Sequence, residues 1–135
     1  MNEYLFVYGT LLSAYDHQKT HDLLSKHAIL VGKATINGRL FMVDYYPGVV
    51  PCEEKSLVKG ELYQVHNSVN LFELLDKYEE FNPLDAEHSE YVRLKVESEL
   101  VNSGQKFEAW TYIYNQSTED LELLPKGDFL REYHK

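Results

Sequence analysis

Residues 6–11 read Phe6-Val7-Tyr8-Gly9-Thr10-Leu11, a short apolar run that continues directly into a glycine. An apolar run of this length is typical of a strand buried on both faces, and we expect Gly9 to end it in a turn. Because glycine has no Cβ, this turn can bring successive backbone N–H groups close to a carboxylate or an oxyanion. The stretch lacks the glycine and lysine pattern of a nucleotide phosphate loop, so a smaller anion fits it better. A purely structural bend at the start of a sheet remains the alternative.

A second informative stretch, residues 75–81, reads Leu75-Asp76-Lys77-Tyr78-Glu79-Glu80-Phe81 and ends a helix expected over about 68–80. At about 100° per residue, one arc of that helix is apolar. Glu79 falls inside this arc, whereas Glu80 points toward the opposite, polar side. The expected members of the arc are Leu71, Phe72, Leu74, Leu75 and Tyr78.

A carboxyl group on a core-facing stripe is unfavourable unless it is paired or lies in a polar cavity. Partial desolvation raises the pKa of a glutamate toward neutrality, which suits a group that must both take and give a proton. Glu79 is therefore a candidate general acid/base. The alternative is a structural cap of the last helical turn, hydrogen-bonded to backbone or to a tyrosine.

The rest of the chain contains more strand-like than helix-like segments. Asn37-Gly38 predicts either a hairpin turn or a bulge in one long strand, and Pro47-Gly48 predicts a turn. Long strands with few helices favour an α+β fold, a small, mostly antiparallel β-barrel with helices packed outside. The expected strands cover 5–8, 29–43, 57–65, 91–101 and 107–114, and the expected helices about 17–27, 68–80 and 128–133.

Length and composition place the chain among ordinary globular proteins. Its 135 residues fit one domain, 1–135, with a sizeable core. The net charge of −9 disfavours nucleic acid and anionic membranes as partners. A single cysteine, Cys52, excludes an internal disulfide and fits a reducing compartment. No apolar run reaches the roughly 20 residues of a membrane span, and no signal peptide is recognisable, so we expect a cytoplasmic protein.

Four short stretches in a specific order resemble the γ-glutamylcyclotransferase-like family, which includes the γ-glutamylamine cyclotransferases and the AIG2-like proteins. The opening strand and loop at 6–11 resemble the family's substrate loop. Residues 75–79 resemble its "L-D-x-Y-E" stretch, which bears the catalytic glutamate. The other two are Tyr46-Pro47-Gly48 followed by Val58-Lys59-Gly60-Glu61-Leu62-Tyr63, which resembles a "V-x-G-E-x-Y" pattern, and Tyr91-Val92-Arg93, which resembles a "Y-x-R" strand.

The resemblance implies a β-barrel with a pocket at one end and a reaction that cyclises a γ-glutamyl compound to 5-oxoproline. Glu79 would be its general acid/base, and no metal or organic cofactor is called for. The implied substrate-binding residues are Tyr8, Gly9, Thr10, Leu11, Tyr91 and Tyr114. Two departures from the family pattern are Glu80, where a glycine is frequent, and the longer connection over 81–90. The leaving group and the oligomeric state stay open.

Other candidate residues and functions are weaker. His17 and His21 have the i, i+4 spacing of metal ligands, but a solvated helix face explains them equally well. Cys52 has no histidine signal that would mark it as a nucleophile. For Arg93, an ion pair on the strand surface is a better interpretation than a pair with an acid inside the barrel. The main alternative to an enzyme is a non-catalytic module that binds a small metabolite in the same barrel. A protein-interaction scaffold is the third possibility.

Overall fold

The computed structural model describes residues 3–9, 11–12, 18–53, 56–79 and 81–132. Five strands close into a barrel in the order β1-β4-β2-β5-β6, after which β6 returns to β1. Neighbouring strands are antiparallel except at the final β6–β1 pair, which is parallel. The predicted small, mostly antiparallel barrel is confirmed. Its strands are β1 (Glu3–Val7), β2 (Ala28–Met42), β4 (Leu57–Val65), β5 (Tyr91–Leu100) and β6 (Lys106–Tyr114).

Strand β2 runs without a break for 15 residues and forms the longest element of the barrel. Its second half alternates between buried and more exposed residues, as a strand with one face on the core should. Gly38 stays in regular register opposite Pro51, so it makes neither the hairpin nor the bulge expected there. The register shift lies instead between Leu30 and Gly32, where β2 pairs with β4.

The expected turn at Pro47-Gly48 is wrong, because these residues begin strand β3 (Pro47–Pro51). The chain reverses earlier, over 43–46, where the N–H groups of Val43 and Asp44 both donate to the Tyr46 carbonyl oxygen. β3 pairs antiparallel with β2 and parallel with β6. A short strand, β7 (Glu122–Leu124), also pairs with the end of β2, and three residues are too few to be recognised from a pattern.

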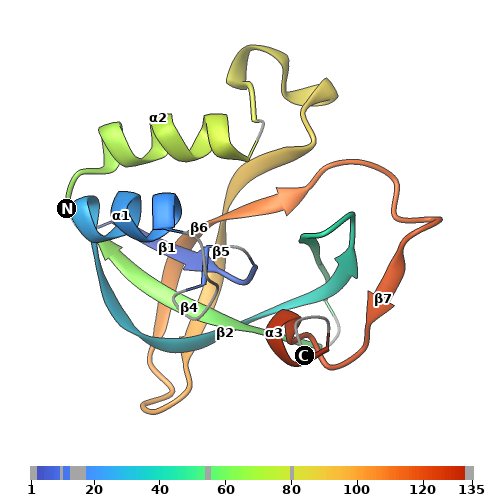
Figure 1. Cartoon of the computed structure of the whole chain (residues 1–135). Helices are drawn as coiled ribbons and strands as arrows, with labels where there is room; N and C mark the ends of the chain where they lie inside the picture. Colours follow the sequence, from blue (N-terminus) through green and yellow to red (C-terminus); the bar gives the residue numbers. More distant parts are fainter. Residues whose placement is uncertain (1–2, 10, 13–17, 54–55, 80, 133–135) are drawn as a thin grey trace.

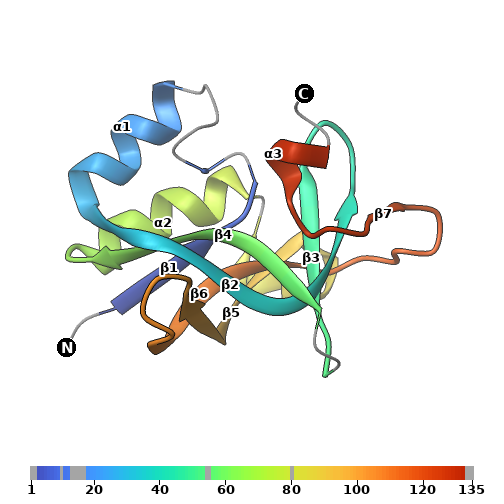
Figure 2. The ribbon, with the colours of Figure 1, turned by 90° about the horizontal axis from the view of Figure 1, so that it is seen from below.

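Two helices, α1 (Gln18–His27) and α2 (Ser68–Tyr78), lie side by side on one side of the barrel, and both views place β7 and α3 (Phe129–Glu132) at the other end (Figures 1 and 2). All three were predicted, with somewhat longer bounds. A 3-10 segment, η1 (Pro83–His88), follows α2. The expected inward arc of α2 is partly wrong. Leu74 and Tyr78 are 46% and 39% exposed, because the buried face is rotated toward Asp76.

The parallel seam between β1 and β6 is joined mainly by side chains. Only Leu5 and Trp110 are paired in register. The Trp110 indole N–H donates to Glu3 Oε2 at 2.7 Å, and the buried Thr111 hydroxyl donates to the Phe6 carbonyl oxygen at 3.0 Å. The Thr111 bond satisfies a backbone carbonyl that a regular ladder would otherwise pair, and the two bonds together hold β1 against β6.

Gly60 in β4 leaves no room for a side chain. A Cβ at this position would overlap the Val7 carbonyl oxygen and lie 2.6 Å from the Phe6 ring. Because backbone cannot move aside as a flexible side chain can, we expect Gly60→Ala to lower the free energy of unfolding by about 3 kcal/mol or more. Gly32→Ala is the matched control, since its Cβ would make an ordinary 3.7 Å contact with Leu100. Urea unfolding measures both, and equal losses would contradict this account.

Candidate active site

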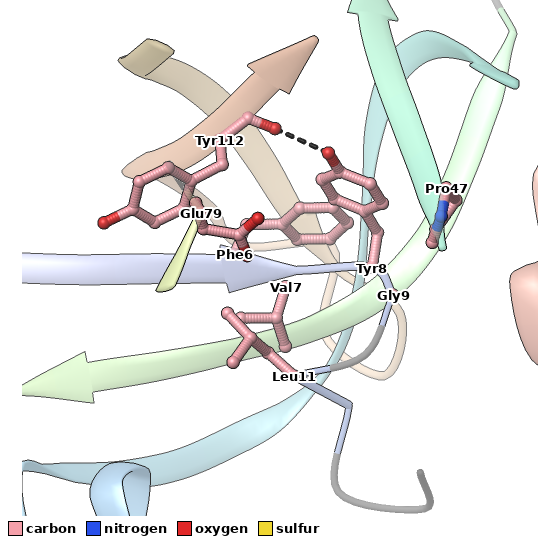
Figure 3. Close-up of a pocket in the computed structure, with 8 residues that line it drawn as sticks. All are labelled: Phe6, Val7, Tyr8, Gly9, Leu11, Pro47, Glu79 and Tyr112. Carbon is pink, nitrogen blue, oxygen red and sulfur yellow. Dashed lines mark hydrogen bonds between the residues drawn. The ribbon is translucent and has the colours of Figure 1, made fainter. Parts of the chain in front are cut away.

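A pocket opens where β1 ends, beside the start of β3 and the end of α2 (Figure 3). Four of the predicted site residues meet there: Tyr8, Gly9, Leu11 and Glu79. Thr10, between Gly9 and Leu11, lies outside the described residues. The pocket is completed by Phe6, Val7, Pro47 and Tyr112.

Glu79 is the C-cap residue of α2, and its N–H donates to the Leu75 carbonyl oxygen at 2.8 Å. Its carboxyl group points into the pocket, near Phe6 and Tyr8 (Figure 3). Burial of the carboxyl group, and secondarily the negative charge of Glu90, raise its pKa from 4.5 to about 8. The negative end of the helix dipole acts in the same direction. Among the described residues, no side chain or amide donates a hydrogen bond to this carboxyl group, so the structure offers no support for the structural-cap alternative.

Tyr8 is fixed by two backbone contacts. Its hydroxyl donates to the Tyr112 carbonyl oxygen at 2.6 Å and accepts from the Val49 N–H at 3.3 Å. Burial, followed by the nearby charge of Glu79, raises the pKa of Tyr8 well above its usual value, so the phenol stays protonated. Its hydroxyl therefore joins β6 to β3, while its ring forms part of the pocket surface.

Gly9 is required by close packing. A Cβ on Gly9 would lie 2.7 Å from Cγ of Pro47, which is itself a pocket residue. The turn is closed by the Leu12 N–H, which donates to the Gly9 carbonyl oxygen at 3.0 Å. The absence of a side chain at Gly9 thus sets the distance between the loop and β3.

A second, outer pocket adjoins the first and shares Glu79 with it. Tyr91, a predicted site residue, lines this outer pocket and donates its hydroxyl to the Pro47 carbonyl oxygen at 2.6 Å. Burial of Tyr91, with the charges of Glu79 and Glu90 among further causes, raises the pKa of its phenol. Tyr114 packs edge-on against the Tyr91 ring at a centroid distance of 5.6 Å. The predicted residues therefore divide between two pockets that share Glu79, except Tyr114, which lines neither of them.

The longer connection over 81–90 folds against the barrel end. Ser89 accepts from the Asn82 N–H at 2.9 Å and donates to the Asp85 carbonyl oxygen at 3.0 Å, while the Asn115 amide donates to the carbonyls of Ala86 and Ser89. This packing delivers Glu90 to the outer pocket. The sequence marked the connection as unusual but gave no sign that Glu90 would face Tyr46.

Sequence reasoning missed one polar cluster close to Glu79. The Asp76 carboxylate accepts from Arg93 Nε at 2.9 Å and from the Tyr112 hydroxyl at 2.7 Å. The Arg93 guanidinium also lies over the rings of Phe72 and Trp110, at 4.4 and 4.8 Å from their centroids. The expected strand-surface ion pair of Arg93 is therefore wrong, because its partner is the buried Asp76. The signal available in the sequence was Asp76 itself, the aspartate of the "L-D-x-Y-E" stretch.

The sequence as a whole matches the family described as gamma-glutamyl cyclotransferase, AIG2-like, over residues 5–131. The chain belongs to this family. It is 32% identical over 128 residues to a Methanocaldococcus jannaschii protein assigned to the gamma-glutamylcyclotransferases, covering 94% of this chain and 95% of that one. It is also 34% identical over 114 residues to the gamma-L-glutamyl-butirosin B gamma-glutamyl cyclotransferase of Niallia circulans, covering 83% and 67%.

Solved structures of other proteins have the same fold as this chain. The solution structure of YtfP from Escherichia coli superposes with a TM-score of 0.63 at 26% identity, covering 94% of this chain and 96% of that one. A mouse AIG2-like protein superposes with a TM-score of 0.68 at 20% identity, covering 87% and 81%. The resemblance inferred from four short stretches is confirmed.

The weaker candidates gain nothing from the structure. His17 lies outside the described residues, as does the side chain of His21. Within the described part of the chain, no group of three or more His, Cys, Asp or Glu side chains could hold a metal ion. Cys52 is in no disulfide and lies, with intermediate exposure, on the segment after β3. None of the described helices is long and apolar enough to cross a membrane.

The cluster around Asp76 anchors the end of α2, three residues before Glu79. We expect Asp76→Ala to lower the free energy of unfolding by about 3 kcal/mol, because it leaves a partly buried guanidinium without its carboxylate. The matched control is Glu97→Ala, which breaks an exposed pair with Lys106 at 3.4 Å and should cost less than about 1 kcal/mol. Denaturant unfolding compares them, and similar small losses would show that the Asp76 pair does not anchor the helix.

The raised pKa of Glu79 makes stability depend on pH. Between pH 4.5 and 8 the folded protein holds a proton that the unfolded chain releases, so stability falls as pH rises through this window. Glu79→Gln removes this dependence. We expect the wild type to lose up to roughly 4 kcal/mol relative to Glu79→Gln between pH 5 and 8. Urea unfolding at several pH values measures the difference. Glu108→Gln, at an exposed position of β6, is the control, and its stability should follow that of the wild type at every pH. If the stabilities of Glu79→Gln and the wild type changed in parallel with pH, Glu79 would not be the group that takes up the proton on folding.

Proposed function

We propose that this protein cyclises a γ-glutamyl amine or γ-glutamyl amino acid to 5-oxoproline and releases the amine, with Glu79 as general acid/base. The observation that carries the proposal is the Glu79 carboxyl group, which faces the pocket beside the β1 loop and has a pKa raised to about 8. A group of this pKa exchanges protons readily near neutral pH. Membership of the family supports the reaction type.

In this reaction the substrate's own α-amino group attacks its γ-carbonyl carbon. Glu79 takes a proton from the α-ammonium, and the neutral amine forms the new C–N bond. The attacking nitrogen loses a second proton as the five-membered lactam closes. Glu79 gives one proton to the leaving nitrogen as the original C–N bond breaks, and the released amine takes up the other and becomes an ammonium ion. One substrate thus yields 5-oxoproline and one amine, with no net change in protons on the enzyme.

Much of the required catalysis comes from holding the substrate folded. Bringing the amine and the carbonyl into contact can contribute several kcal/mol through proximity alone. The backbone N–H groups of Gly9, Thr10 and Leu11 would donate hydrogen bonds to the substrate's α-carboxylate, because a turn at a glycine can present successive N–H groups to an anion. The rings of Tyr8 and Tyr112 would pack against the glutamyl chain, since both line the pocket.

The test is 5-oxoproline release from a panel of γ-glutamyl amines, amino acids and isopeptides, by the wild type and Glu79→Gln. We expect the wild type to turn over at least one of them and Glu79→Gln to lose activity by about a thousandfold or more, since general acid/base groups contribute 10²–10⁴-fold. Glu108→Gln controls for the loss of one carboxylate. If the wild type released nothing while ligands still raised its Tm, the protein would be a binding module instead.

The pH dependence gives an independent check of the role of Glu79. Because the base must be ionised, kcat/KM should rise with pH through a midpoint near 8. The negative charge of Glu90 contributes to this raised pKa, so Glu90→Gln should move the midpoint to lower pH. An unchanged midpoint in Glu90→Gln, or a profile with no transition between pH 6 and 9, would count against Glu79 as the base.

A further inference from the structure

The outer pocket is placed to receive the part of the substrate that leaves. It meets the inner pocket at Glu79, the residue that must protonate the leaving nitrogen, so this inference rests on the proposed function. With the glutamyl unit in the inner pocket, the leaving group extends from Glu79 into the outer one. The residues that line the outer pocket are Asp44, Tyr45, Tyr46, Lys77, Tyr78, Glu79, Glu90 and Tyr91.

The charges around this space are unevenly distributed. Asp44 comes from the turn before β3, Glu90 from the residue before β5, and Lys77 from the last turn of α2. Since Glu79 is largely neutral below pH 8, the described residues that line this pocket include two carboxylates and one ammonium group. A second positive charge, brought by the ligand, would balance the pocket, whereas a carboxylate would add to its excess of negative charge.

Glu90 is the better-placed of the two carboxylates. It is half-buried, and its Oε2 accepts a hydrogen bond from the Tyr46 hydroxyl at 2.5 Å. Asp44 is exposed, so solvent screens its charge more strongly. A half-buried carboxylate that accepts a hydrogen bond from a tyrosine is held in one orientation, so its negative charge has a defined position beside the pocket.

Aromatic rings form the rest of the surface around Glu90. Tyr45 and Tyr46 pack edge to face at 4.9 Å, and Tyr46 and Tyr91 follow at 6.2 Å. These contacts keep several electron-rich ring faces beside the carboxylate. Ring faces of this kind attract alkylammonium groups and pack well against a methylene chain.

We infer that the leaving group is a cationic amine, an alkyl chain that ends in a second ammonium group, and that Glu90 is the counter-ion that selects it. The aromatic rings of Tyr45 and Tyr46 would pack along the chain. A leaving group that carries a carboxylate, such as a free amino acid released through its α-amino group, would place this carboxylate close to Glu90 and Asp44.

The experiment compares three γ-glutamyl amides of similar length that differ in the charge at the far end. They are the amides of 1,4-diaminobutane, n-pentylamine and 4-aminobutanoate, which end in an ammonium, a methyl and a carboxylate group. Their kcat/KM values are measured by 5-oxoproline release with the wild type, Glu90→Gln, Tyr46→Phe and the control Glu108→Gln. Ratios between amides are compared, because removing Glu90 also alters the pKa of Glu79 and affects all three equally.

The wild type should prefer the ammonium amide over the methyl amide by about tenfold, and disfavour the carboxylate amide. Glu90→Gln should reduce the ammonium-to-methyl ratio by about five- to tenfold, the size expected for a partly buried ion pair. Tyr46→Phe keeps the ring but frees Glu90, so we expect a smaller reduction in the same direction. Glu108→Gln should leave the ratio unchanged.

Two results would overturn the inference while leaving the proposed function intact: equal turnover of the ammonium and methyl amides by the wild type, or an unchanged ratio in Glu90→Gln. If none of these amides is turned over while a γ-glutamyl amino acid is, the inference fails and the proposed function stands. If the whole panel of γ-glutamyl compounds is inert, the proposed function fails, and calorimetry with the same three amides takes the place of kinetics. Tighter binding of the ammonium amide, lost in Glu90→Gln, would then still support the cation site, and equal affinities would reject it.

Discussion

The parallel seam between β1 and β6 is the contact on which the rest of the structure depends. It closes the barrel with one register pair and relies on side chains to join backbones that have no regular ladder. Just beyond β1, the Tyr8 hydroxyl donates to the Tyr112 carbonyl oxygen, and both residues line the inner pocket (Figure 3). The same two segments therefore close the barrel and form one wall of the pocket. Their contact helps to fix the position of the β1 loop relative to Glu79.

Local patterns were sufficient for most of the fold, because each depends on residues close in sequence. Strand β4 was predicted at its observed bounds, and α1, α2 and α3 were predicted with slightly longer bounds than the structure gives them. The wrong interpretations concern distant partners. Pro47-Gly48 carries a turn signature, yet its place in β3 depends on pairing with β2 and β6. The inward face of α2 was misplaced for the same reason, since Asp76 is buried only because Arg93 and Tyr112 meet it there.

The two halves of the site differ in how far sequence could reach. The inner pocket was accessible, because Glu79 stood out as a carboxylate on an apolar arc and Gly9 as a bend after a buried strand. The outer pocket was not, since Tyr46 and Glu90 are 44 residues apart and neither follows a periodic pattern. Their meeting requires both the early reversal over 43–46 and the packing of the 81–90 connection by Ser89 and Asn115. Such long-range pairing has no local signature.

The position of Glu79 at the junction of the two pockets couples its charge to the ligand. In the free protein, burial and Glu90 keep its carboxyl group protonated near neutral pH, which avoids an ionised carboxylate at a buried site. In the proposed reaction, a substrate would bring an α-ammonium group beside that carboxyl group, and an opposite charge at close range lowers the pKa of a carboxyl group. Under this proposal, substrate binding itself would convert Glu79 from an acid into a base, because the compensating positive charge arrives with the substrate.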